Sequence, residues 1–133
     1  MKNKIIMILG GTGALGQTLT KRYNDDNKII IFSRDEHKQV NLSRVFSDVT
    51  FHIGDVKDKD SVLQALNEYK PDVVINTAAL KHVPICEDNP YESVKTNIIG
   101  HKNLIDCVNL SKHQIETLMF ISTDKACKPI NVY

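Results

Sequence analysis

The sequence predicts an α/β fold in which helices cover a doubly wound parallel sheet. Apolar, strand-like runs alternate five times with helix-like segments along the 133 residues, and such alternation favours parallel strands joined by helical crossovers. The first apolar run, residues 4–9, passes directly into a glycine-rich turn and a helix-like segment, as in a Rossmann-like nucleotide-binding unit. We therefore expect a single domain over residues 1–133 with the strand order 3-2-1-4-5, truncated after the fifth strand.

The composition is that of an ordinary globular protein. Hydrophobic residues make up 41% and charged residues 25% of the chain, and the formal net charge is +1. We expect neither nucleic acid nor a membrane as partner, and no apolar run approaches the roughly 20 residues that span a bilayer. The three cysteines are widely spaced, which favours reduced thiols and a cytoplasmic location. No metal site is expected, because His82 and Cys86 lack a second pair of ligands.

The glycine-rich turn suits the phosphates of a dinucleotide. Gly10 permits the tight turn, Gly13 lets the backbone approach a pyrophosphate, and Gly16 allows the following helix to pack closely. The N–H groups and positive dipole at the start of that helix, expected over Ala14–Tyr23, would hold the phosphates. A triphosphate-binding loop is excluded, because Gln17 stands where that motif needs its lysine. The turn residues expected to contact the cofactor are Gly10, Thr12, Gly13, Ala14, Leu15 and Gly16.

The end of the second strand, expected over residues 28–32, indicates which dinucleotide binds. A unit that binds NAD usually has an acidic residue here, which accepts from the ribose 2′-hydroxyl. This chain has Ser33 and Arg34, with Lys38 one turn further on. A hydroxyl and two cations would bind a 2′-phosphate that a carboxylate would repel, so we expect NADP as the cofactor. The alternative is that Ser33 and Arg34 are ordinary surface residues.

The first three helices are each predicted to pack on the sheet through an apolar face. Asp35 and Glu36 suit the first turn of the second helix, and the third strand follows over residues 49–53. Asp58 is expected to cap the third helix, which Pro71 ends. The apolar faces carry Leu15, Leu19 and Tyr23 on the first helix, Val40, Val45 and Phe46 on the second, and Val62, Leu63, Leu66 and Tyr69 on the third.

The ends of the third and fourth strands are expected to complete the cofactor site. Asp55 is expected to accept from the exocyclic amine of the adenine, beside Val56. The fourth strand, over residues 72–77, ends in small residues that let a cofactor lie close. Residues 81–90 hold two prolines and an acidic pair, which predicts an irregular loop over the site. The small residues expected to contact the cofactor are Thr77, Ala78 and Ala79.

A long helix is expected over residues 91–110 and the fifth strand over 116–121. An apolar stripe is expected along the helix at Val94, Ile98, Ile105 and Val108. Asn97 falls on this helix, and two roles stay open for it: bridging of backbone groups and catalysis. We include Asn97 and Ser122 among the expected cofactor contacts. Asp124 beside Lys125 follows the fifth strand, where open α/β sheets place reacting groups. This pair suits acid–base chemistry near a nicotinamide, although it would also fit a surface ion pair.

Six motifs together resemble one enzyme family. They are G-G-T-G-A-L-G at 10–16, F-S-R-D-E at 32–36, G-D-V at 54–56, A-A-L-K-H-V-P at 78–84, S-T-D-K-A at 122–126 and P-I-N-V-Y at 129–133. Over the whole chain these motifs resemble the extended short-chain dehydrogenase/reductases. Within them, the closest resemblance is to the UDP-N-acetylglucosamine 4,6-dehydratases of the C5-inverting kind, which serve polysaccharide biosynthesis. The glycine motif is shared by many sugar epimerases and dehydratases, whereas S-T-D-K-A is much narrower.

The resemblance implies a mechanism and residue roles. NADP+ would take hydride from C4 of a UDP-sugar while Tyr133 removes the hydroxyl proton. The resulting ketone acidifies the C5–H, which Lys125 would remove as the base. Asp124 would protonate the departing C6 hydroxyl, and NADPH would return hydride to C6. Thr123 would position the sugar, and Lys81 resembles a family lysine near the cofactor.

One departure concerns Tyr133. The family tyrosine belongs to Y-x-x-x-K, and that lysine would stand four residues beyond Tyr133, where the chain has ended. We therefore expect the amino-terminal part of a longer enzyme, without its carboxyl-terminal substrate domain and inactive alone. When full length, it is expected to pair into a homo-oligomer through the long helix. The alternatives are a non-catalytic NADP-binding module and a fragment of a nucleotide-sugar 4-epimerase, in which Asp124 and Lys125 have no elimination role.

Overall fold

The computed structural model describes residues 1–124 and 127, which fold around one five-stranded sheet. Every strand pair in this part of the chain is parallel, and the order β3-β2-β1-β4-β5 confirms the doubly wound prediction. The strands are β1 (Ile5–Leu9), β2 (Lys28–Ser33), β3 (Thr50–Ile53), β4 (Val73–Asn76) and β5 (Thr117–Phe120). The helices are α1 (Ala14–Tyr23), α2 (Glu36–Ser43), α3 (Lys59–Tyr69), α4 (Val83–Asp88), α5 (Pro90–Val94), the π-helical turn η1 (Lys95–Ile99) and α6 (Gly100–Leu110).

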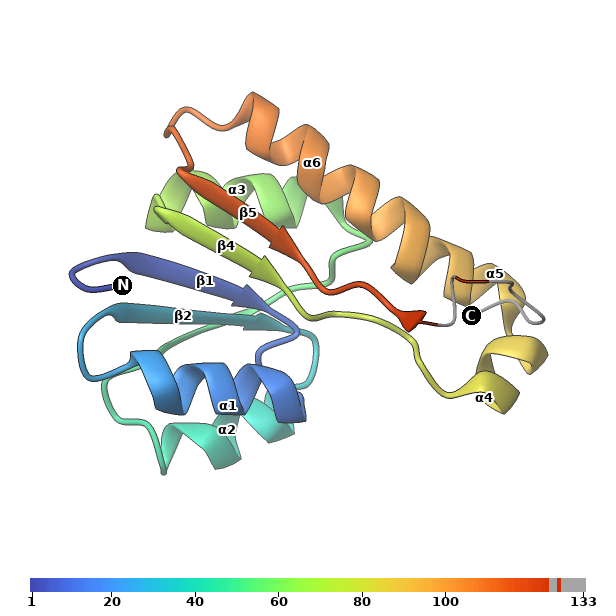
Figure 1. The fold of residues 1–133 in the computed structure, drawn as a ribbon, viewed down its shortest axis with the longest axis horizontal. Helices are drawn as coiled ribbons and strands as arrows, with labels where there is room; N and C mark the ends of the chain where they lie inside the picture. The colour runs from blue at the N-terminus through green and yellow to red at the C-terminus, as the bar shows by residue number, and fades with distance from the viewer. Residues whose placement is uncertain (125–126, 128–133) are drawn as a thin grey trace.

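The sheet separates two helical layers (Figure 1). Helices α1 and α2 cover one face, and α3 and α6 cover the other. Because successive residues of a strand point to opposite faces, β1 and β2 contribute to both cores and are apolar at nearly every position. Met7 and Ile30, for example, pack with Leu104 of α6, whereas Ile6 and Ile8 pack on the other face.

The inner face of α1 differs from the predicted one. Gly16 and Thr20 are the buried positions. Leu19 and Tyr23 are only partly buried against the core, and Leu15 is 43% exposed. An ideal Cβ on Gly16 would stand 2.5 Å from the backbone of the preceding turn. Because α1 meets the turn through this glycine, the neighbouring Leu15 is displaced from the core.

The apolar face predicted for the second helix is wrong at Val40 and Val45, whereas Phe46 packs against the core as expected. Val40 is 46% exposed, and Val45 is 71% exposed and lies beyond the end of α2. The buried residues are Leu42 and Gln39. The Gln39 Nε2 donates to the backbone and side-chain oxygens at the end of β2 and to a β3 carbonyl, at 2.8 to 3.0 Å. A polar side chain is therefore buried because it joins two strand ends, which apolar periodicity does not reveal. The predicted cap of α3, Asp58, is confirmed. Asp35, which the sequence predicts in the first turn of the second helix together with Glu36, is the N-cap of α2.

The segment predicted as an irregular loop over residues 81–90 contains the short helix α4. Pro84 stands in the first turn of α4, and Pro90 begins α5. Proline is tolerated there because the first N–H groups of a helix have no intrahelical acceptor. Both prolines therefore start helices rather than interrupt them. Figure 1 shows α4 and α5 beyond the carboxyl ends of the strands.

The long helix predicted over residues 91–110 is interrupted by η1. The predicted apolar stripe is wrong at Ile98 and Ile105, which are 63% and 46% exposed. Thr96, Gly100 and Leu104 are buried instead. A π-helical turn holds more residues than an α-helical turn, so it shifts the angular phase of the residues that follow it.

A helix that crosses a membrane must be both long and apolar. None of the helices in the described part of the chain combines the length and the apolar composition that such a span needs.

A chain of charges ties the loop after β3 to α5. Lys57 Nζ lies 2.9 Å from one oxygen of Glu92, and Lys95 Nζ lies 2.9 Å from the other. These two charged hydrogen bonds, first that from Lys95 and then that from Lys57, lower the pKa of Glu92 to about 2.

This depressed pKa predicts an acid-sensitive contribution to folding. The Glu92 carboxylate favours the folded state above its ordinary pKa of 4.5, and that contribution is lost as the pH falls toward 2. The unfolding free energy of the parent chain should therefore decrease more steeply between pH 5 and about 2 than that of Glu92→Gln. Urea titrations at several pH values measure both curves. Parallel curves would contradict the ion pairs as described.

Candidate functional site

The turn between β1 and α1 presents backbone N–H groups to an open space. Gly10 has a φ of +73°, and its ideal Cβ would stand 2.7 Å from the backbone N of Ala78. The N–H of Gly10 donates to the carbonyl of Phe32 at 2.8 Å, and the N–H of Gly13 donates to the carbonyl of Gly10 at 2.9 Å. No side chain of the described residues caps α1 at Gly13. The first N–H groups of α1 are therefore available to an anion.

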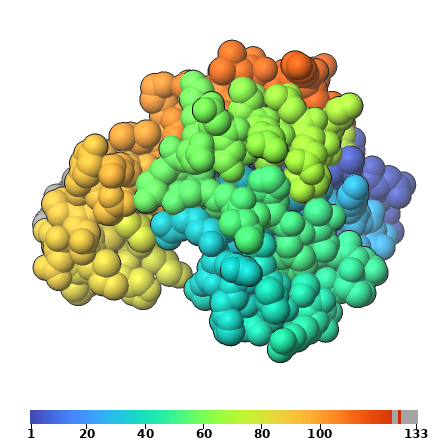
Figure 2. Space-filling model, turned by 180° about the vertical axis from the view of Figure 1, so that it is seen from behind, coloured from blue at the N-terminus to red at the C-terminus, as the bar shows by residue number. Residues whose placement is uncertain are grey.

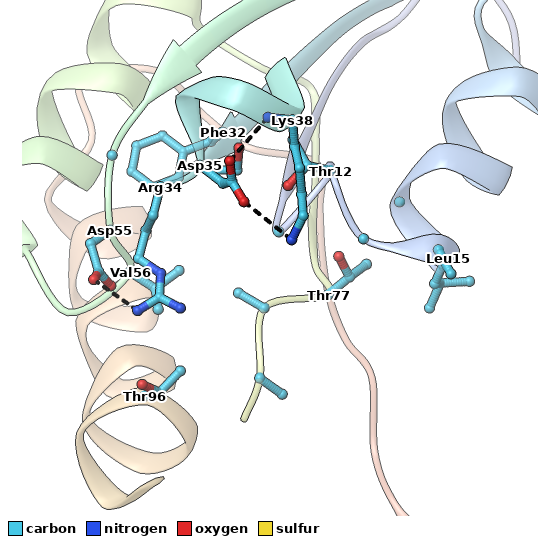
Figure 3. Close-up of a pocket in the computed structure, with 18 of the residues that line it drawn as sticks. Thr12, Leu15, Phe32, Arg34, Asp35, Lys38, Asp55, Val56, Thr77 and Thr96 are labelled. Atoms are coloured by element: carbon cyan, nitrogen blue, oxygen red, sulfur yellow. Dashed lines mark hydrogen bonds and ion pairs between the residues drawn. The ribbon is translucent and has the colours of Figure 1, made fainter. Parts of the chain in front are cut away.

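A cavity of about 280 Å³ opens at this turn and extends along the carboxyl ends of the strands (Figure 3). Seen from behind, the surface is hollowed between the cyan segment that follows β2 and the yellow segment that holds α4 and α5 (Figure 2). The cavity brings together fifteen predicted cofactor residues: Gly10, Thr12, Gly13, Ala14, Leu15, Gly16, Ser33, Arg34, Lys38, Asp55, Val56, Thr77, Ala78, Ala79 and Lys81. Sequence reasoning missed four other lining residues: Phe32, Asp35, Gly54 and Thr96.

A second cavity of about 300 Å³ adjoins the first at the ends of β4 and β5. Three further predicted residues, which the first cavity does not include, line it: Asn97, Ser122 and Thr123. Asn76, His101 and Ile121 line it too and were not predicted as site residues. The two cavities share the lining residues Leu15, Thr77, Ala78, Ala79 and Lys81. An elongated ligand could therefore extend from one cavity into the other.

The two cations at the rim of the first cavity are each paired with an aspartate (Figure 3). Arg34 Nη1 lies 3.5 Å from Asp55 Oδ2, and Lys38 Nζ lies 3.2 Å from Asp35 Oδ2. The N–H of Lys38 also donates to Asp35 Oδ1, and this bond together with the ion pair lowers the pKa of Asp35. The Arg34 and Lys38 side chains are 56% and 62% exposed, so both pairs are weak. The cations remain available to a stronger anion.

Ser33 provides a hydroxyl beside these cations. Its side chain is buried, and its Oγ accepts a hydrogen bond from Gln39 Nε2 at 2.9 Å. A hydroxyl that accepts one bond can still donate its own proton. Ser33 is thus arranged to donate to an anion bound near Arg34.

Three residues of the cavity walls hold a buried polar atom with no hydrogen-bond partner among the described residues. Thr96 Oγ1 belongs to the first cavity, and Asn76 Nδ2 and His101 Nδ1 belong to the second. Burial lowers the pKa of His101, which opposes the effect of the nearby Thr96 and Asn97 carbonyls, so its ring is neutral near pH 7. A buried polar atom without a partner costs about 1–3 kcal/mol. The walls therefore fit a polar ligand.

Asn97 has a structural role in this arrangement. Its Oδ1 accepts from the N–H of Leu80 at 2.9 Å, and its Nδ2 donates to the carbonyl of the same residue at 2.9 Å. These two hydrogen bonds to the backbone of one residue hold the segment after β4 against η1. Of the two roles considered for Asn97, bridging of backbone groups is the one observed.

The predicted acid–base residues follow β5. Thr123 lines the second cavity, and its Oγ1 donates to Asp124 Oδ1 at 3.5 Å. Asp124 is exposed. Lys125 and Tyr133 lie outside the described residues, so their predicted roles stay predictions.

Comparisons with known proteins agree with this geometry. A family model described as "Polysaccharide biosynthesis protein" matches residues 6–133. The UDP-N-acetylglucosamine 4,6-dehydratase (inverting) of Campylobacter jejuni serotype O:23/36 is 45% identical over 135 residues. That match covers 98% of this chain, which spans 39% of the length of the relative.

Solved structures share the fold. The structure of Pen from Bacillus thuringiensis superposes with a TM-score of 0.92 at 34% identity, covering 99% of this chain and 41% of that one. The UDP-glucose 4-epimerase from Brucella ovis, solved in complex with NAD, superposes with a TM-score of 0.82 at 21% identity. It covers 98% of this chain and 43% of the epimerase, and this likeness shows the common fold.

Proposed function

This chain belongs to the polysaccharide biosynthesis protein family, and from that premise we propose that it is the cofactor-binding part of an NADP-dependent UDP-N-acetylglucosamine 4,6-dehydratase. The observation that carries the proposal is one cavity lined by the glycine turn and the ends of β2, β3 and β4. Parallel α/β sheets bind dinucleotides at this edge. The identity of 45% with the Campylobacter jejuni dehydratase supports the substrate and reaction.

The residues of the first cavity fit the cofactor. The N-terminus of α1 would hold the pyrophosphate at Gly13, and Asp55 would accept from the adenine amine. Arg34 and Lys38 would bind the 2′-phosphate, with a hydrogen bond from Ser33. The end of β2 has a serine and an arginine at positions 33 and 34, and the next residue, Asp35, is paired with Lys38, which favours NADP over NAD. When bound, the cofactor supplies hydride transfer with the sugar.

The acid–base roles follow from the position of S-T-D-K-A after β5. We assign Lys125 as the base at C5, Asp124 as the acid for the C6 hydroxyl, and Tyr133 as the group that takes the C4 hydroxyl proton. Thr123 would orient the sugar from the wall of the second cavity. Elimination needs a base and an acid on the same sugar, which this motif provides.

We also propose how the longer enzyme assembles and in which compartment it acts. The chain is proposed as the amino-terminal part of a longer enzyme, and the carboxyl-terminal part of that enzyme would bind the substrate. Copies of the longer enzyme would pair through the exposed apolar residues of the long helix, such as Ile98 and Ile105. The free thiols Cys86 and Cys107 suit the cytoplasm.

A chimaera of this chain with the remaining part of the Campylobacter jejuni dehydratase tests the function. It should convert UDP-N-acetylglucosamine to a 4-keto-6-deoxy product, measured by mass spectrometry as the loss of one water. Lys125→Ala should slow this conversion by about a hundredfold or more, whereas replacing Lys112, an exposed lysine that lines neither cavity, with alanine should not. A chimaera that only epimerises C4 would favour the epimerase alternative. One that binds NADP and leaves the sugar unchanged would overturn the substrate assignment.

A further inference from the structure

One carboxylate oxygen at the cavity rim is shared by two cations. Asp55 Oδ2 lies 3.5 Å from Arg34 Nη1 and 3.6 Å from Lys57 Nζ. The other oxygen, Oδ1, accepts from the backbone N–H of Lys57 at 3.0 Å. Asp55 is thus fixed by its own loop, and Arg34 is the partner that arrives from another strand.

The two cations differ in how firmly they are held. Lys57 is only 27% exposed, and its Nζ also lies 2.9 Å from Glu92 of α5. Arg34 is 56% exposed and has Asp55 as its single ion-pair partner among the described residues. Lys57 is therefore anchored on two sides, whereas Arg34 is free to leave.

We propose that Lys57 is a positioning residue for cofactor selection: it neutralises Asp55 so that Arg34 can turn to the 2′-phosphate of NADP. This inference rests on the proposed function, which places that phosphate beside Arg34. Lys57 does not line the cavity, and in the described part of the chain Asp55 is the only lining residue with which its side chain forms an ion pair. It acts through the carboxylate.

Lys57 acts by compensating the charge of Asp55. When Arg34 moves to a phosphate, Asp55 retains Lys57 as its counter-ion, so the departure leaves no unpaired carboxylate. Without Lys57, Asp55 would hold Arg34 more strongly and would also repel the phosphate. A ligand with a 2′-hydroxyl does not need Arg34 to move. Lys57 therefore affects NADP and leaves NAD unaffected.

Calorimetric titration of this chain with NADP+ and with NAD+ tests the inference. Lys57→Met keeps the aliphatic stem and should weaken NADP+ binding by about threefold to fivefold, the range of exposed ion pairs, with NAD+ binding unchanged. Lys59→Met is the matched control, because Lys59 pairs with Asp106 at 2.9 Å, away from the cavity. It should change neither affinity. An unchanged ratio of the two affinities in Lys57→Met overturns the inference.

A second pair of variants tests whether Lys57 acts through Asp55 or only by adding positive charge near the cavity. In an Asp55→Asn background, Lys57→Met should no longer alter the ratio of the two affinities. The same loss of NADP+ affinity in both backgrounds would overturn the positioning role. If the parent chain prefers NADP+ and only the Lys57 result fails, the proposed function stands. A parent chain without that preference overturns the NADP assignment together with this inference.

Discussion

Replacing Gly16 with alanine is expected to abolish dinucleotide binding and to lower the free energy of unfolding by about 3 kcal/mol. An ideal Cβ at this position stands 2.5 Å from both the Cα and the carbonyl oxygen of Gly11. Both atoms belong to the backbone of the glycine turn, so no flexible side chain can move aside. The added methyl group must push α1 away from the turn, and the N–H groups that face the cavity move with it. Urea unfolding and calorimetric titration measure the two effects.

Gly13→Ala is the matched substitution in the same turn. Its ideal Cβ meets only the carbonyl oxygen of Gly10, at 3.3 Å, and its φ of −76° suits any residue. The free energy of unfolding should therefore change by less than about 1 kcal/mol, while the methyl group occupies space that a pyrophosphate would use. Tight binding by Gly13→Ala would contradict the placement of the phosphates. Stability of Gly16→Ala equal to that of the parent chain would contradict the close contact between α1 and the turn.

The strands and their order follow from local pattern, because a strand of a parallel sheet is apolar on both faces. The apolar runs at residues 5–9 and 28–33 can therefore be recognised as strands from the sequence. Helix faces are harder to predict. Gln39 is buried because it joins the ends of β2 and β3, and Ile98 is exposed because η1 changes the phase of the long helix. Both effects depend on residues distant in sequence or on hydrogen-bond geometry, and apolar periodicity records neither.

The candidate site is more predictable than the helices. The carboxyl ends of parallel strands meet at one edge, so motifs after β1, β2, β3 and β4 must converge there. Fifteen predicted residues lie in one cavity for this reason. The sequence did not reveal the ion pairs between them. Asp55 follows β3 and Arg34 follows β2, and nothing in either local pattern shows that the two side chains meet.

Arg34→Ala is expected to weaken NADP+ binding by about tenfold to a hundredfold and to leave NAD+ binding unchanged. A charged hydrogen bond contributes about 1.5–3 kcal/mol, which corresponds to these factors. Arg34 is well suited to the role because its pair with Asp55, at 3.5 Å and largely exposed, is easily exchanged for a doubly charged phosphate. Calorimetric titrations of the two dinucleotides give both affinities.

Arg44→Ala is the control for loss of a positive charge. Arg44 caps the far end of α2 and does not line the cavity, so its removal should leave the ratio of NADP+ to NAD+ affinity as it was. Added salt should weaken NADP+ binding more than NAD+ binding in the parent chain, and this difference should be smaller in Arg34→Ala, in which Lys38 is the remaining cation of the pair. An equal loss of both affinities in Arg34→Ala would mean that the guanidinium supports the fold of the site and does not read the 2′-phosphate. A selective loss means that the end of β2 sets the choice of cofactor, because only the 2′ substituent distinguishes the two ligands.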